Sequence, residues 1–303
     1  RRALTASYRY LIMGTVGATF YVIAVGLMYM MTGTLNMADL AERLPAVAHT
    51  RTIEASLAFL TVGIGLKMAM FPLHTWLPNA YTQAPSAVSA FVASTATKVA
   101  VYAMIRMYFT VFGGVDVMKT MPIHEVLLGL ALIAMFAASF VSIFQENVKR
   151  LLAYSSVAQI GYMVLGISMD SVPGLTGSIL HLFNHAAMKC ALFLAVGFLI
   201  HRYGSADVTA YGGLQRVVPV FAGTFLVIGL SALALPGLSP FVSEIMVLVG
   251  AFPVAKAAVI VSAFGVVLAA LYVLLTYQKV FTGPVDEKHA GTRELTRRER
   301  VVL

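Results

Sequence analysis

The stretch Lys67-Met-Ala-Met-Phe-Pro-Leu-His-Thr-Trp-Leu-Pro78 places a lysine and two prolines inside an apolar run that extends from Ile53 to Pro78. Proline lacks a backbone donor and interrupts the hydrogen-bond ladder of a helix. Lipid cannot satisfy the backbone groups that such a break frees, so the break has to face other protein or a hydrated cavity. The stretch therefore predicts an interrupted membrane helix, with two simple kinks as the alternative interpretation.

Apolar runs of this length recur along the whole chain. Hydrophobic residues make up 59% of the 303 residues, charged residues 11%, and the mean hydropathy is +0.86. Soluble domains are about 25% charged, whereas a membrane helix needs about 20 apolar residues. The pattern predicts an all-α polytopic membrane protein, with residues 1–303 forming a single transmembrane domain. The eight predicted segments are Tyr8–Met31, Ile53–Pro78, Ser86–Phe112, Val126–Phe144, Arg150–Met169, Gly174–Ile200, Arg216–Ala251 and Val254–Phe281.

The seventh segment carries a second break. It is too long for one crossing and contains Leu235-Pro-Gly-Leu-Ser-Pro240, so we interpret it as a broken helix that crosses once. Paired interruptions in corresponding positions indicate an inverted-repeat transporter. Pro72 and Pro78 are predicted to mark the first break, and Pro236 and Pro240 the second.

Basic residues predict the topology. The net charge of +8 comes from loops and from the basic stretch 282–303, which includes Lys288, rather than from one patch of the nucleic-acid-binding type. Eight crossings leave only Arg43, Arg51, Lys119 and Lys256 on the side opposite the chain ends. Because basic loops favour the cytoplasm, both ends are predicted to be cytoplasmic, with 282–303 as a basic tail or loop. The chain opens without a signal-peptide pattern and closes where an apolar run starts, so we expect a fragment of a longer chain.

Ionisable side chains inside the apolar segments predict a proton path. Placing a charged group at bilayer depth costs roughly 2.5–3.5 kcal/mol on insertion scales. Each such group is therefore expected to have an oppositely charged or polar partner, to contact water, or to serve a function. Histidine and buried lysine both exchange protons readily. Spacing at i, i+4 and i+8 sets two histidines and a lysine on one helix face. The candidates are Lys67, Lys98, His181, His185, Lys189 and Glu244.

Other interpretations of these residues stay open. Lys67 fits a static ion pair, Glu244 a helix cap, and His181 with His185 a satisfied core pair. Zinc is the rival for the two histidines, but no nearby carboxylate completes a coordination sphere. The single Cys190 excludes a disulfide framework and a multi-cysteine metal site. The sequence contains no phosphate-binding loop, no Ser-His-Asp set and no haem or flavin signature, so no cofactor and no metal are predicted.

Four stretches together resemble the antiporter-like membrane subunits shared by respiratory complex I (subunits L, M and N) and the Mrp multisubunit cation/proton antiporters (subunits A and D). The resemblance covers nearly the whole chain. It implies a fold of fourteen helices with two inverted repeats, each with one broken helix, of which this chain resembles helices six to thirteen. The stretches are Lys67–Tyr81, Ala84–Ala90, Lys149–Tyr162 and His181–Lys189.

The resemblance also implies roles. Lys67 matches the lysine beside the first break, which in the family pairs with a glutamate on an earlier helix outside this sequence. Lys98 matches the lysine that links two half-channels, and Glu244 the terminal group of the second. The central polar chain of the family is matched by His181, His185 and Lys189.

The expected function is proton translocation within a larger membrane complex. Residues up to Gly213 look most like the D-type subunit of Mrp antiporters, and Pro236–Lys279 like the M-type subunit of complex I. A hydrogenase-linked subunit stays open. The alternatives are a Na⁺/H⁺ exchange subunit and a structural scaffold that transports nothing. The expected partners are other membrane subunits, the lipid bilayer, protons and Na⁺, but no nucleic acid, and the expected location is the bacterial inner membrane.

Overall fold

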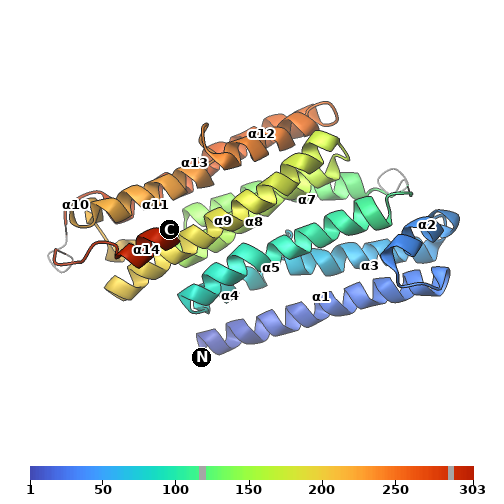
Figure 1. Ribbon diagram of the computed structural model, residues 1–303, viewed down its shortest axis with the longest axis horizontal. Coiled ribbons are helices and arrows are strands. Elements are labelled where there is room, and N and C mark those ends of the chain that lie inside the picture. The colour runs from blue at the N-terminus through green and yellow to red at the C-terminus, as the bar shows by residue number, and fades with distance from the viewer. Residues whose placement is uncertain (116–120, 286–289) are drawn as a thin grey trace.

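The computed structural model describes residues 1–115, 121–285 and 290–303. Lys119 and Lys288, which the topology prediction used, lie outside the described residues. The described chain forms an elongated bundle of helices that run along one common direction (Figure 1). Its extended backbone pairs only at an isolated bridge between Asn147 and Asp207.

Six helices in the described residues are long and apolar enough to cross a membrane. They match the predicted segments in order, and α8 is almost entirely buried while α1 lies at the edge of the bundle. Hydrophobic length therefore predicted their positions well. The six are α1 (Arg2–Thr32), α5 (Ser86–Arg106, continued by a π-helical turn at Met107–Val111), α7 (Ile123–Ile143), α8 (Val148–Ser168), α9 (Val172–Tyr203) and α13 (Lys256–Phe281).

Two further crossings are interrupted, as the prolines predict. The first consists of α3 (Arg51–Met68) and α4 (Trp76–Gln83), and the second of α11 (Pro219–Ala232) and α12 (Ser239–Ala251). The six long helices and these two interrupted pairs make eight crossings in the described residues. Because eight is an even number, the chain returns to the end of the bundle at which it began. Both termini accordingly lie at the same end (Figure 1).

The two breaks begin with the same backbone geometry. Ala69 (φ 59°) and Ala234 (φ 54°) both adopt the left-handed conformation. The following amides donate back five residues, Met70 N to Gly65 O at 2.9 Å and Leu235 N to Leu230 O at 3.1 Å. This is the Schellman ending of a helix, which normally uses glycine. The repeated alanine ending is a local sign that the two broken helices are structurally equivalent.

The prolines divide between the breaks and the helices that follow. Pro72 and Pro236 lie in the non-helical segments 69–75 and 233–238. Pro78 and Pro240 lie in the first turns of α4 and α12, where a missing backbone donor leaves no helical bond unmade. The first break therefore starts before Pro72 and ends before Pro78, because a left-handed residue rather than a proline terminates α3.

Short helices close the two ends of the bundle. A helix with a proline inside it, α2 (Met37–Val47), lies beyond α1, and Asn36 caps it by accepting from Ala38 N and Asp39 N. At the other end lie a 3₁₀ turn (Val208–Ala210), α10 (Leu214–Val217) and α14 (Arg297–Val302). These elements lie outside the crossings; α2, the 3₁₀ turn and α10 connect successive crossings, and α14 follows the last one.

The C-terminal segment 290–303 is tied to the bundle rather than extended as a tail. Arg202 at the end of α9 bonds Glu299 through Nη2 and Oε2 at 2.7 Å. The Glu294 carboxylate accepts from Val220 N at 2.8 Å and Phe221 N at 3.1 Å. A carboxylate at the N-terminus of α11 satisfies amides that the helix itself leaves free. The described part of the predicted basic tail thus fastens α9 to α11.

We expect Glu299→Gln to loosen this segment. The Arg202 guanidinium lowers the pKa of the Glu299 carboxyl to about 2. The pair therefore stabilises the contact fully above the unfolded pKa of about 4.3, and loses this effect as the pH falls through about 2. At neutral pH, loss of the pair costs about 1 kcal/mol, which raises the opened population about fivefold. Trypsin cleavage after Arg297 and Arg298, followed by mass spectrometry, measures that opening.

The matched control is Glu42→Gln, which removes an exposed acid in α2 and should leave this cleavage unchanged. Equal cleavage rates in the two variants would show that the Arg202–Glu299 pair does not hold the segment.

Candidate functional site

Four of the predicted residues meet in the centre of the bundle. Lys98 on α5 is 4% exposed, and His181, His185 and Lys189 on the facing side of α9 are each at most 1% exposed. The four-residue spacing on α9 stacks the two histidine rings with centroids 5.9 Å apart and planes at 12°. Lys98 interacts electrostatically with each of the three α9 groups. The structure therefore brings these four side chains into one buried cluster.

Both lysines of the cluster are held by hydrogen bonds to neutral groups. Lys98 Nζ donates to Ala93 O at 2.5 Å and to Thr97 Oγ1 at 3.3 Å. Lys189 Nζ donates to Ser155 Oγ at 2.5 Å and to Leu152 O at 3.1 Å, both on α8. Within the described chain neither lysine has a carboxylate in salt-bridge contact. Neutral acceptors hold an amine in place whether or not it carries the extra proton, which suits a group that gains and loses it.

His181 connects the cluster to the second broken helix. Its Nε2 lies 2.7 Å from Gln159 Oε1, and its Nδ1 lies 2.9 Å from Ser243 Oγ. Because the Gln159 oxygen only accepts, Nε2 carries the hydrogen. The Ser243 hydroxyl donates either to His181 Nδ1 or to Pro240 O, which lies at 2.8 Å. Protonation of Nδ1 is then matched by rotation of one hydroxyl.

Glu244, the neighbour of Ser243 on α12, is buried beside this connection. It is 4% exposed and forms a side-chain contact with Gln159, while its charge also acts on Tyr162 and Tyr272. Gln159 can accept from His181 through its oxygen and donate to Glu244 through its nitrogen. Glu244 therefore reaches the histidines through Gln159, rather than by a direct bond.

His185 is the least satisfied member of the cluster. It is fully buried, and neither of its ring nitrogens has a hydrogen-bond partner in the described chain. Its ring lies against His181 and within electrostatic reach of Lys98 and Lys189. Buried polar groups are normally paired, so an unpaired buried imidazole calls for a specific explanation such as a functional role or a bound water. His185 is therefore a buried imidazole with both nitrogens unbonded, within electrostatic reach of both lysines of the cluster.

Lys67 lies apart from this cluster. It is exposed in a groove of about 330 Å³ between α1, α3 and α5. The small residues that precede it let α1 approach closely, since a Cβ on Gly63 would lie 2.7 Å from Tyr21 N. Within the described chain Lys67 has no salt-bridge partner. The structure thus separates the lysine beside the first break from the lysine at the centre.

Sequence analysis missed two buried polar residues. Gln159 is 2% exposed in the middle of α8, and only its isolation among apolar residues marks it. Lys149 was assigned to a loop by its position, yet it is 4% exposed and its Nζ donates to Ala84 O at 2.5 Å. Ala84 ends α4, where a cation complements the helix dipole. No sequence signal separates this lysine from its neighbour Arg150.

The described residues contain no group of three or more His, Cys, Asp or Glu that could hold a metal ion. Both nitrogens of His181 are engaged by Gln159 and Ser243. The arrangement is one of proton donors and acceptors on four helices, with the two ends of the series formed by Lys98 and Glu244.

Comparison with known proteins gives a match over most of the chain. The family model described as "NADH:quinone oxidoreductase/Mrp antiporter, TM" matches residues 1–271. Subunit N of the NADH-quinone oxidoreductase of Desulforudis audaxviator is 41% identical over 251 residues, covering 82% of this chain and 50% of the relative. Subunit M of the Mycobacterium tuberculosis enzyme is 33% identical over 309 residues, covering 98% of this chain and 55% of the relative.

A solved structure matches as well. A chain of the Mrp complex from Dietzia sp. superposes with a TM-score of 0.87 at 28% identity, covering 93% of this chain and 52% of the other. The chain thus spans about half the length of the relatives it matches.

Proposed function

Since this chain belongs to the NADH:quinone oxidoreductase/Mrp antiporter transmembrane family, we propose that it conducts protons across a membrane as part of one subunit of a multisubunit complex. One observation carries the proposal. Lys98, the two histidines and Glu244 form a buried series that links α5, α9, α8 and α12. Buried ionisable groups in a membrane protein cost free energy, and they are therefore rarely present without a function such as proton transfer.

The proton passes between groups that carry the same positive charge when protonated and therefore repel one another. A proton on Lys98 disfavours a second one on the α9 residues, because all of them lie in a medium of low dielectric constant. Titration of such a set is shared, so the protonation of each member depends on the protonation of the others. His181 moves the proton's charge toward Gln159 and Glu244 by changing which of its ring nitrogens, Nδ1 beside Ser243 or Nε2 beside Gln159, carries the hydrogen. Lys98 and Glu244 are the two terminal groups of this path.

The proposal extends to the rest of the predicted site. Lys67 serves a separate path beside the first break and takes an acidic partner from outside this chain. The breaks at Pro72 and Pro236 provide free backbone groups and space beside the paths, with Pro78 and Pro240 starting the second half-helices. We further propose that residues 1–303 form one transmembrane domain of a longer protein, in a bacterial inner membrane, with both described ends cytoplasmic.

A second candidate is the exchange of Na⁺ for protons. The superposition on a chain of an Mrp complex favours it, whereas the matches to oxidoreductase subunits M and N favour redox-driven proton transport. Both candidates use the same buried series and differ in the driving reaction and in the partner subunits.

Reconstitution of the full-length protein with its co-purified subunits tests the proposal. We expect acidification of the vesicle lumen, reported by a trapped pH dye, under one of two drives: an imposed Na⁺ gradient or electron transfer to quinone. The drive that works assigns the complex. Sealed vesicles with an intact complex and no proton movement under either drive would favour the scaffold interpretation.

A further inference from the structure

The first turn of α12 follows the second break directly and is tied to α9. Ser239 Oγ donates to Asn184 Oδ1 at 2.6 Å, and Asn184 Nδ2 donates to Ser239 O at 3.0 Å. The same Nδ2 group also donates to Ser243 Oγ at 3.2 Å. These bonds fix which end of the Asn184 amide is the donor. They also hold both ends of the turn 239–243 against α9.

Ser243 lies where this turn meets the central cluster. Its side chain is 0% exposed, and its hydroxyl oxygen lies 2.9 Å from His181 Nδ1 and 2.8 Å from Pro240 O. A hydroxyl group has one hydrogen to donate and two lone pairs that accept. Ser243 can therefore donate to only one of these two atoms at a time. The choice depends on whether His181 Nδ1 carries a hydrogen.

Both protonation states of His181 leave the Ser243 hydroxyl fully bonded. When Nδ1 carries no hydrogen, Ser243 donates to Nδ1 and accepts from Asn184. When Nδ1 is protonated, Ser243 accepts from both His181 and Asn184, and its own hydrogen turns to Pro240 O. No covalent bond changes at Ser243, because the hydroxyl only rotates. A proton that arrives on His181 is thereby converted into a new hydrogen bond inside α12.

The bond to Pro240 O is formed within the first turn of α12. A serine hydroxyl that bonds a carbonyl three or four residues back in its own helix slightly destabilises and bends that helix. The segment 233–238 before this turn is not helical, so no preceding helical turn resists the bend. Glu244 is the residue that follows Ser243. A bend in the turn therefore changes the position of the Glu244 carboxyl.

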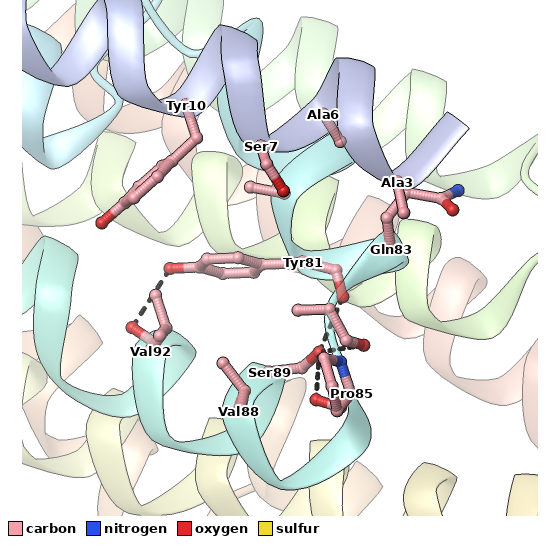
Figure 2. Close-up of a pocket in the computed structure, with 12 residues that line it drawn as sticks. Ala3, Ala6, Ser7, Tyr10, Tyr81, Gln83, Pro85, Val88, Ser89 and Val92 are labelled. Carbon is pink, nitrogen blue, oxygen red and sulfur yellow. Dashed lines mark hydrogen bonds between the residues drawn. The ribbon is translucent and has the colours of Figure 1, made fainter. Parts of the chain in front are cut away.

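Within the described residues, the first break lacks this arrangement. Ser89 bonds the second half-helix of that break, but all its acceptors are carbonyl oxygens (Figure 2). They are Tyr81 O at 2.8 Å, and Ala84 O and Pro85 O at 3.2 Å each. A backbone carbonyl does not gain or lose a proton near neutral pH. Of the two serines, Ser243 is therefore the one that contacts a titrating group.

We propose that Ser243 is a positioning residue that couples proton arrival on His181 to the shape of the α12 turn that carries Glu244. The inference rests on the proposed function, because it assumes that His181 gains and loses a proton during transport. The protonation of His181 in turn depends on the titratable groups of the helices around it. These are Lys98 on α5, Tyr162 on α8, His185 and Lys189 on α9, Glu244 on α12 and Tyr272 on α13.

Replacement of the serine tests the coupling in the full-length protein assembled in its complex. We expect Ser243→Ala to slow proton transport about tenfold or more, because misplacing a reacting group by about 1 Å can cost about a hundredfold. Ser243→Thr keeps the hydroxyl and should retain most of the transport.

Ser262→Ala is the matched control. Ser262 is also 0% exposed, and among the described residues its hydroxyl bonds only Ala258 O, in its own helix α13. The control therefore loses the same kind of bond within a helix but no contact with a histidine. We expect it to transport at the wild-type rate.

Infrared spectroscopy tests the coupling without relying on a rate. The carboxyl stretching band of Glu244 is identified by its absence in Glu244→Gln, and its position reports the surroundings of the carboxyl group. A pH step that protonates the histidines should shift this band in the wild type and in Ser262→Ala. The charge on His181 acts on the band in every variant, so we expect a smaller shift in Ser243→Ala rather than none. A serine that only packs within α12 would leave the shift unchanged.

Two results would overturn the coupling: wild-type transport in an assembled Ser243→Ala complex, or equal infrared shifts in Ser243→Ala and Ser262→Ala. If Ser243→Thr is as slow as Ser243→Ala, the infrared comparison decides. The Lys98→Met complex separates this failure from failure of the proposed function. Lost transport in Lys98→Met with normal transport in Ser243→Ala removes the coupling alone. Normal transport in Lys98→Met removes the proposed function and the coupling together.

Discussion

Lys98→Met is expected to reduce proton transport by about a hundredfold or more. Methionine matches the length and flexibility of lysine but carries no exchangeable proton. Lys98 is the one α5 member of the buried cluster, and all three α9 groups interact with it. Its loss therefore separates the α9 residues from any donor on α5. The measurement is the initial rate of lumen acidification in vesicles that hold the assembled complex.

Assembly should survive this change. Replacing a buried ionisable group by an apolar one of similar volume is often neutral or stabilising. Among the residues that the structure describes, Lys98 bonds only Ala93 O and Thr97 Oγ1, and neither belongs to another helix. Subunit content by native gel and the midpoint of thermal unfolding check this. An assembled Lys98→Met complex that pumps at the wild-type rate would contradict the role of Lys98.

Glu244→Gln is expected to have an effect of similar size, about a hundredfold on transport. Glutamine keeps the shape of the side chain and can still bond Gln159, but it cannot titrate. Glu244 is 4% exposed, and its carboxyl lies among Gln159, Tyr162 and Tyr272. If Glu244 is the last proton-exchanging group of the buried series, the neutral amide of the Gln variant stops proton release there, while His181 and Ser243 keep their positions.

Glu244→Lys separates the transport role from a packing role. A lysine can titrate at the same position, so we expect it to retain more transport than glutamine does. A purely structural Glu244 gives the reverse order, because glutamine fits the site and a longer, charged side chain does not. Initial transport rates for the two variants, each normalised to assembled complex, decide between these orders. A fully active Gln variant ends the exit role of Glu244.

The sequence by itself determined where the chain crosses the membrane and where two crossings break. Both are local properties: apolar length sets a span, and the prolines mark where a crossing is interrupted, although left-handed Ala69 and Ala234 begin the breaks themselves. The spacing of His181, His185 and Lys189 also determined that they share a face of α9, because helical periodicity holds in any packing. The family followed from short motifs, and the match over residues 1–271 confirms it.

Only the tertiary structure decided which polar groups meet. Gln159 bonds a histidine that is 22 positions away in the sequence, and Lys149 bonds a carbonyl that is 65 positions away. The structure also separated Lys67 from Lys98, although both are lysines within apolar runs. Such pairings depend on how helices cross, and hydropathy does not encode that.

The burial of α8 shows the physical reason. It is among the least apolar of the six long spans and yet the most completely buried. A helix surface that faces lipid must be apolar, because lipid offers no hydrogen bonds. A helix surrounded by protein can carry Ser155, Gln159 and other polar groups, because neighbouring helices satisfy them. Hydropathy therefore locates the spans but ranks their depth in the bundle poorly, and the ionisable side chains of the central cluster lie on the deeply buried helix faces.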